Sequence, residues 1–381
     1  MNSHPKICKA LLSNKPRRLG RFAGFSVVEL MVGLTLGLFL VGVAAAVFVA
    51  SRQSLKVQDN SAHIQESARA LIEDITKEVR RGASFGCYVP KQEVQFMVTA
   101  TMPTGSGGTF PLPPVSANNF VHGGDVSALS LPGTSGVTRV SGTDYIGVQY
   151  GQPAANLVVG GGPNASLDFA ASYPMNHSLT VAAGQPMIIA DCNSATMFRV
   201  DDTGTVSTLN HVIGGANNVV PPDIVGSDPI LSGNVYQTGT TIMWFQAPVF
   251  FVGEDGSGRR SLYRWDTSNS GGVQPMVPNV EQMQVVFGVD SASQPTQLNS
   301  VTQWLSGAAV EMGGLWQNVM AVSAHLVVRS DEELAIEPKN FVWDSSRMMF
   351  VPSSLASDLY VRQTYVVTAT LRNRAPMINA N

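Results

Sequence analysis

Glu29 is the residue whose surroundings most strongly demand a chemical role. It is the only charged residue in the apolar run 25–50. A carboxylate at the centre of a membrane costs about 2.5–3.5 kcal/mol or more, and it costs less near the interface, where Glu29 would lie. A low dielectric penalises an unpaired carboxylate, so a nearby cation would stabilise it. The alternative is an interfacial side chain that reaches the lipid headgroups.

Other residue patterns give no support for catalysis. The sequence lacks the G-x-x-x-x-G-K-[ST], H-E-x-x-H and G-x-S-x-G motifs, and its six histidines show no metal-ligand spacing. Asp191, Asp201 and Asp202 resemble site carboxylates, but at strand ends such residues more often cap turns. No basic patch with interleaved aromatic residues follows residue 90, and the pI is near 6.1. We therefore expect no enzymatic activity, no metal, no cofactor and no direct binding of nucleic acid.

A basic leader and one membrane span must position Glu29. Residues 1–24 hold six basic residues and no acid, so the leader carries +6 in a chain whose total charge is −3. Residues 30–50 are uncharged, and a membrane-spanning helix needs about 20 such residues. The positive charge before the span predicts a cytoplasmic N-terminus and a single pass, with everything after about residue 52 outside the inner face of the membrane. The run is too long for an ordinary signal peptide and has no A-x-A site at its end.

The same helix is expected to continue beyond the membrane. No proline occurs over 25–81, and Gly82 is a candidate C-cap. The 57 residues would form a helix of roughly 85 Å. An apolar stripe at helical spacing marks its second half as amphipathic. The stripe consists of Val57, Ile64, Ala68, Leu71, Ile75 and Val79.

Residues 83–381 favour β structure. Hydrophobic content of 44% and a net charge of −3 argue against a mainly disordered chain. Strand-like runs separated by turn signals are expected at 94–99, 126–131, 145–150, 157–159, 186–190, 197–200, 241–252, 261–265, 282–289, 319–329 and 364–371. A long loop is expected at 101–125 and a hairpin turn at 253–258. The prediction is an α+β fold, with a long N-terminal helix packed on a large, mainly antiparallel β head.

Cys87 and Cys192 are the two cysteines outside the leader, which holds Cys8. An oxidising periplasm favours a disulfide between them. A closed loop of about a hundred residues could stabilise the fold by up to ~4.7 kcal/mol in the chain-entropy model. The bond would tie the end of the helix to the β head. The alternative is two separate buried thiols.

Gly24, Phe25 and Glu29, with the leader before them and the span after them, resemble the prepilin signal of type IV pilins and type II secretion pseudopilins. The resemblance implies that a membrane prepilin peptidase cuts between Gly24 and Phe25 and methylates the new N-terminus. It also implies a role for Glu29. Its carboxylate would pair with the Phe25 amine of a neighbouring subunit and so set the register of a filament.

Several short segments resemble PilW-type minor pilins. They are 186–192 with 195–200, 258–264, 280–290 and 370–374. The resemblance implies three parts: a cytoplasmic leader at 1–24, a long helix at 25–82 with residues 25–50 in the membrane, and a periplasmic head at 83–381. It implies a minor pilin that helps to initiate pilus assembly, in a priming or tip complex with other minor pilins, the major pilin and a large tip adhesin. Incorporation into the extracellular pilus is part of that expectation.

Two alternatives stay open at this point. The first is a minor pseudopilin of a type II secretion system, which the N-terminus cannot distinguish from a pilin. The second is a membrane-anchored periplasmic enzyme or binding protein whose start resembles a prepilin by chance.

Overall fold

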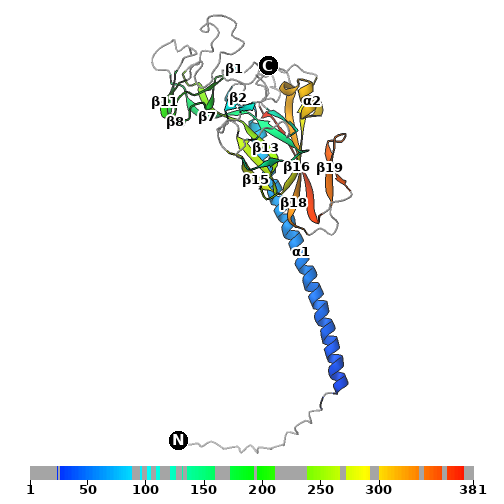
Figure 1. Ribbon diagram of the computed structural model, residues 1–381. Helices are drawn as coiled ribbons and strands as arrows, with labels where there is room; N and C mark the ends of the chain where they lie inside the picture. Colours follow the sequence, from blue (N-terminus) through cyan, green and yellow to red (C-terminus); the bar gives the residue numbers. More distant parts are fainter. Residues whose placement is uncertain are drawn as a thin grey trace, which may run out of the picture. The chain divides into compact units, whose positions relative to one another are not determined.

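The computed structural model (Figure 1) describes residues 24, 26–87, 95–96, 101–103, 109–111, 121–125, 131, 135–158, 172–192, 195–210, 238–266, 272–291, 300–333, 339–353 and 358–372. The chain divides into two compact units, residues 1–56 and 57–381. Phe25, residues 1–23 and the tail 373–381 lie outside the described residues.

The long helix α1 runs over Val27–Arg81 and so contributes to both units. In the second unit its predicted stripe is buried at Ile64, Ala68, Leu71, Ile75 and Val79. Val57, the first residue of the predicted stripe, is instead 41% exposed. Each fully buried Leu or Ile contributes about 1.5–3 kcal/mol of hydrophobic stabilisation, so this stripe anchors the helix to the β structure.

The end of α1 differs from the prediction of a glycine C-cap. The left-handed backbone conformation falls on Ala83, with φ of 61°, and not on Gly82. Gly82 is needed for close packing, because a Cβ there would lie 2.6 Å from Leu371 Cδ2. The helix therefore ends where its backbone approaches the end of the last strand, and glycine provides the space.

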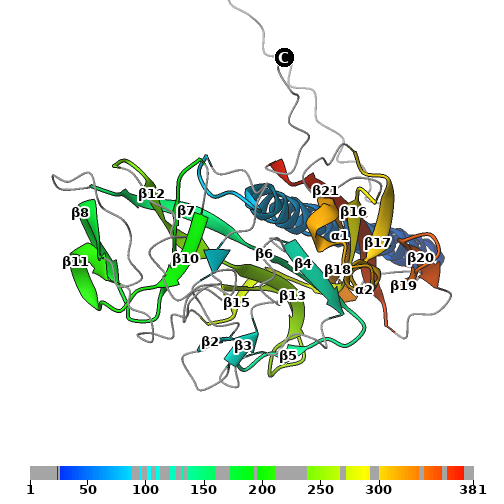
Figure 2. The same cartoon turned by 90° about the horizontal axis from the view of Figure 1, so that it is seen from above.

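Among the described residues of the second unit, the strands form three sheets and three strand pairs (Figures 1 and 2). The six-stranded sheet contains β4 (Val121–Asp125), β5 (Thr138–Arg139), β6 (Asp144–Val148), β13 (Pro248–Glu254), β14 (Arg260–Asp266) and β15 (Gln274–Pro278). The four-stranded sheet has the order β17 (Gln303–Ser306), β16 (Val280–Val289), β18 (Val319–Glu333) and β21 (Tyr360–Thr370). The five-stranded sheet has the order β1 (Gln95–Phe96), β10 (Ala195–Arg199), β9 (Pro186–Ala190), β12 (Thr241–Gln246) and β7 (Tyr150–Asn156).

The strand pairs are β8 (Ser172–Val181) with β11 (Gly204–Asn210), β19 (Asn340–Asp344) with β20 (Met349–Ser353), and β2 (Thr101–Pro103) with β3 (Thr109–Pro111). Among the described strands every pairing is antiparallel except that of β1 with β10. The short helices α2 (Gly307–Met312) and η2 (Trp316–Asn318) precede β18. The predicted α+β class, with a mainly antiparallel sheet domain, is confirmed.

The strand predictions succeed where the sequence is apolar and fail where it is polar. The run 186–190 coincides with β9, and 282–289 lies inside β16. The expected loop at 101–125 is wrong, because β2, β3 and β4 lie within it. The run 241–252 is two strands, since Ala247 separates β12 from β13. The sequence does not predict β8, β11, β15, β17, β19 and β20, because their alternation of apolar and polar residues is weak.

Candidate assembly site

The start of α1 holds the predicted processing and register residues. Gly24 and Glu29 are both exposed, and Phe25 lies outside the described residues. The helix opens with the Leu30 amide donating to the Ser26 carbonyl over 3.1 Å, which places Glu29 in the first turn. Free amides at a helix start favour a nearby carboxylate. The position therefore suits an acid, and its side chain is accessible to a partner.

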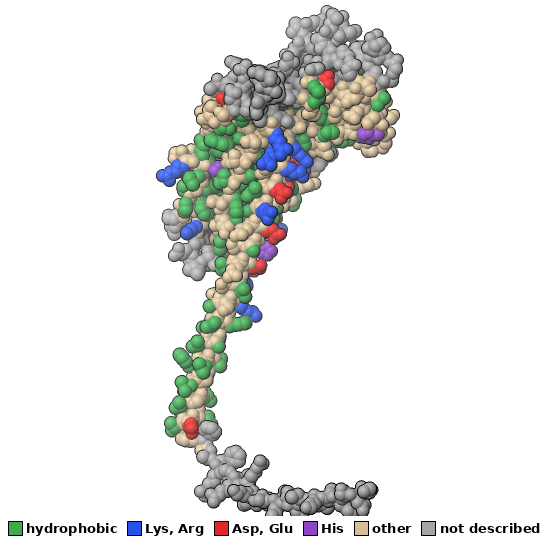
Figure 3. All heavy atoms as spheres, turned by 180° about the vertical axis from the view of Figure 1, so that it is seen from behind, with side chains coloured by type: hydrophobic (Ala, Val, Ile, Leu, Met, Phe, Trp, Pro, Cys, Tyr) green, Lys and Arg blue, Asp and Glu red, His purple; other side chains and the backbone are tan. Residues whose placement is uncertain are grey.

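The helix surface that follows Glu29 is apolar and uncovered. Every described residue of 26–58 is exposed, including Leu30, Phe39, Val47 and Phe48. Figure 3 shows apolar side chains along this part of α1, on the face in view. By length and composition α1 is able to cross a membrane. A helix that is apolar all round needs either lipid or other helices as its surroundings, which fits a membrane-anchored protein.

Cys87 and Cys192, which lie 105 positions apart in the sequence, are joined in a disulfide. Cys87 follows the end of α1, and Cys192 follows β9. The bond therefore connects the helix end to the five-stranded sheet. Both cysteines are exposed, so the bond is accessible to a reductant.

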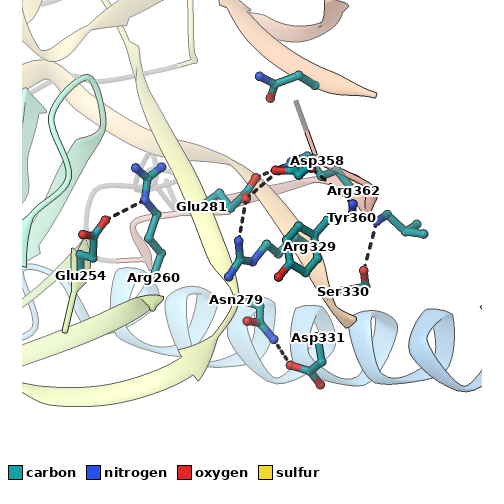
Figure 4. Close-up of polar contacts among 12 residues, drawn as sticks. Glu254, Arg260, Asn279, Glu281, Arg329, Ser330, Asp331, Asp358, Tyr360 and Arg362 are labelled. Carbon is teal, nitrogen blue, oxygen red and sulfur yellow. Dashed lines mark hydrogen bonds and ion pairs between the residues drawn. The ribbon is translucent and has the colours of Figure 1, made fainter. Parts of the chain in front are cut away.

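A buried charge cluster joins three strands of the four-stranded sheet (Figure 4). Arg362 on β21 donates through Nε to Glu281 Oε2 at 2.6 Å and through Nη2 to Glu281 Oε1 at 3.0 Å. The same guanidinium makes two bonds of 2.7 Å to Asp358. Arg329 on β18 approaches Glu281 within 3.6 Å and lies over the Tyr360 ring. The cluster thus ties the last strand to the sheet interior.

The electrostatics of this cluster follow from its bonds. The hydrogen bonds from Arg362 hold the pKa of Asp358 below its ordinary value. Those to Asp358, and then those to Glu281, raise the pKa of Arg362. The side chains of Arg362 and Glu281 are only 5% and 10% exposed, so little solvent screens the pair. The sequence gives no local signal for this pair, since the two residues lie 81 positions apart.

A second polar group lies where β4 meets β6. Burial raises the pKa of Asp144 to about 6, and the nearby Asp125 also raises it, although the Val285 amide donates to Asp144 at 2.9 Å. Burial lowers the pKa of His122 to about 4. The His122 ring packs beside Gly147, where a Cβ would lie 1.8 Å from its Cε1. The bond between Asp144 and Val285 joins the six-stranded sheet to β16, and these groups hold no arrangement of nucleophile and base.

Asp202, one of the aspartates that the sequence singled out, has a structural role. Asp202 accepts from the backbone and side-chain nitrogens of Asn210 at 2.6 and 2.8 Å, which ties the connection between β10 and β11 to the end of β11. Across the part of the chain that the structure describes, no group of three His, Cys, Asp or Glu residues is placed to hold a metal ion.

Comparison with known proteins adds one match. Residues 249–373 match the family model described as type IV pilus-assembly protein W (PilW). The matched region begins in β13 and ends just after β21, so it includes the complete charge cluster of Glu281, Arg329, Asp358 and Arg362. No curated protein and no solved structure matches the chain. The match indicates a role in type IV pilus assembly, and the matched family is not a family of enzymes.

Proposed function

From the match of residues 249–373 to a type IV pilus-assembly family, we propose that the chain is a minor type IV pilin that helps to initiate pilus assembly. The observation that carries the proposal is the occurrence of this match in the same chain as an uncovered apolar helix that is able to span a membrane. An assembly subunit that stayed in the periplasm as a free protein would have no use for such a helix.

The processing steps belong to the same proposal. The chain is made as a prepilin with a cytoplasmic leader at 1–24, and a prepilin peptidase cuts between Gly24 and Phe25. Residues 25–50 hold the product in the inner membrane in a single pass, and the head at 83–381 lies in the periplasm. The sequence order of leader, Glu29 and apolar run supports these steps.

The partners follow from the same arrangement. The subunit joins other minor pilins and the major pilin through the apolar part of α1, in a priming complex that includes a large tip adhesin. The carboxylate of Glu29 forms an ion pair with the N-terminal amine of Phe25 in a neighbouring subunit. The accessible first-turn position of Glu29 supports this role, because a carboxylate in low dielectric gains most when a cation pairs with it.

Mass spectrometry of the protein extracted from membranes tests the processing steps. We expect a mature chain that begins at methylated Phe25, and a full-length chain in cells without the peptidase. A start at Met1 in cells with active peptidase would overturn the pilin assignment. The same spectra with and without reductant test the disulfide, because its reduction raises the mass of the protein by about two daltons.

A second experiment separates a pilus role from secretion. Deletion of the gene should abolish or reduce surface pili and twitching while leaving protein secretion intact. The opposite result, with normal pili and lost secretion, would assign the chain to a type II secretion pseudopilus.

A further inference from the structure

Strands β7 to β12 form a separate group within the second unit. They come from one contiguous stretch of chain, residues 150–246, which we call the lobe. Strands β7, β9, β10 and β12 belong to the five-stranded sheet, and β8 pairs with β11. Among the described strands, no strand of the lobe pairs with a strand of the six-stranded or the four-stranded sheet. Figure 2 shows β7, β8, β10, β11 and β12 on one side of the second unit and β16 to β21 on the other.

The lobe is joined to the six-stranded sheet at a narrow junction. Gln149 alone separates β6 from β7, and Ala247 alone separates β12 from β13. The two connections lie side by side, because β7 pairs with β12 and β6 pairs with β13. The ladder is interrupted between these two pairings, and Pro248 has no amide hydrogen to donate there. Both connections are thus single residues at one place, which is the geometry of a hinge.

The buried apolar residues of the lobe are largely separate from the main core. One cluster, which includes Phe198, lies wholly within the lobe. A second cluster joins the lobe to its surroundings, and its members outside the lobe are Ala83, Phe85 and Ala247. Among the described residues, the main core cluster contains one residue of the lobe, Tyr150. Apart from Phe85 and its neighbours, little apolar burial therefore resists a movement of the lobe.

Two backbone hydrogen bonds attach the segment after α1 to the junction. The Ala83 amide donates to the Gln149 carbonyl at 3.0 Å, and the Gly151 amide donates to the Ser84 carbonyl at 2.8 Å. A swing of the lobe relative to α1 would lengthen both bonds. The amide hydrogens of Ala83 and Gly151 therefore report on such a movement, because an amide exchanges with solvent when its hydrogen bond opens.

The disulfide holds the same segment to the lobe at a second point. Cys87 follows the end of α1, and Cys192 follows β9 within the lobe. A covalent bond outside the junction blocks rotation about the junction for as long as the bond is intact. Both cysteines are exposed, so a thiolate in solution reaches their sulfur atoms.

We propose that the disulfide between Cys87 and Cys192 is a redox-operated clamp on a hinged lobe, and that a dithiol opens it. A thiolate of the dithiol attacks one sulfur atom, the S–S bond breaks, and a mixed disulfide forms. The second thiol of the reductant then displaces the protein sulfur. Two electrons and two protons pass to the protein, which leaves two cysteine thiols and a disulfide in the reductant. The open lobe swings about Gln149 and Ala247, and a disulfide oxidant fixes it again. This inference goes beyond the pilus role and does not depend on it.

Hydrogen–deuterium exchange of the full-length protein in detergent micelles tests the clamp. A Cys8→Ser background leaves Cys87 and Cys192 as the only cysteines. Dithiothreitol without denaturant should reduce the bond completely, and the Ala83 and Gly151 amides should then exchange faster by about tenfold or more. Exchange within β9 and within β18 should not change, because their ladder bonds lie inside the two groups that move. Oxidised glutathione should restore the slow exchange.

A variant without the two cysteines separates the clamp from effects of the reagent. Cys87→Ser/Cys192→Ser should show the fast exchange at Ala83 and Gly151 without dithiothreitol, and no further change when it is added. A disulfide that resists reduction without denaturant, or unchanged exchange after reduction, would overturn the proposal. Faster exchange throughout β9 and β12 would also overturn it, because the bond would then stabilise the fold of the lobe and not its position. So would an effect of dithiothreitol on the double variant.

Discussion

Arg362 on β21 bonds to Glu281 on β16 across the strand that separates them, β18. The pairing register slips between Val280 and Gln282, so Glu281 lies at an irregularity in β16. Such a bulge re-aims a side chain. The guanidinium of Arg362 reaches the carboxylate past Arg329, its register partner on β18. One irregularity thus lets a buried carboxylate connect three strands.

Loss of this pair should destabilise the fold. Arg362→Gln leaves the buried Glu281 carboxylate with only the longer contact to Arg329. We expect the free energy of unfolding to fall by about 3–5 kcal/mol, measured by urea denaturation. Arg260→Gln is the control, because its pair with Glu254 is about 40% exposed and should be worth only about 0–1 kcal/mol. Equal losses in the two variants would contradict a special role for the buried pair.

Asp144 should make stability depend on pH. Its folded pKa is raised from 3.8 to about 6, so the fold favours the protonated acid. That contribution is complete below pH 4 and is lost as pH rises to about 6. Asp144→Asn removes it. The variant should therefore gain stability relative to the wild type, by up to about 3 kcal/mol, between these pH values.

The contribution of His122 to stability changes with pH in the opposite direction. Its folded pKa is lowered from 6.5 to about 4, so its contribution is complete above pH 6.5 and is lost as pH falls. In the wild type the two residues largely offset each other, and Asp144→Asn should expose the rising curve of His122. Urea denaturation at several pH values measures both curves. Parallel curves for wild type and variant would show that Asp144 has no raised pKa.

Gly147 should tolerate no side chain while His122 is present. Gly147→Ala places a Cβ against the imidazole ring and should cost about 1–3 kcal/mol. Gly256→Ala is the control, because no atom lies within 4 Å of its Cβ position. In a His122→Ala background the added cost of Gly147→Ala should largely disappear. An unchanged cost in that background would place the strain elsewhere.

Glu29 should matter for assembly and not for anchoring. Glu29→Ala should still insert into the inner membrane, because the apolar run is unchanged, but it should be poorly incorporated into filaments. Counts of surface pili and the amount of the subunit in sheared pilus fractions measure this. Thr35→Ala, on the same exposed helix, is the control. A normal pilus count in the Glu29→Ala strain would remove the register role.

The success of sequence reasoning varied with the range of the interactions involved. The α1 stripe at 64–79 could be predicted, because helical spacing places those residues on one face. The strands β19 and β20 could not, since their sequences hold Asn340, Asp344, Pro352 and Ser353 and read as a loop. Likewise, nothing local marks His122 or Gly147 as neighbours. They are adjacent only because β4 pairs with β6.

The sequence by itself determined the N-terminal plan: the basic leader, the isolated Glu29, the uncharged span and the long helix. Each of these depends on charge, hydrophobicity and spacing over a few tens of residues. Only the tertiary structure decided that Glu281 meets Arg362, that Asp144 accepts a bond from the Val285 amide, and that His122 packs beside Gly147. These features depend on strand order and register, which are set by packing between segments far apart in the chain.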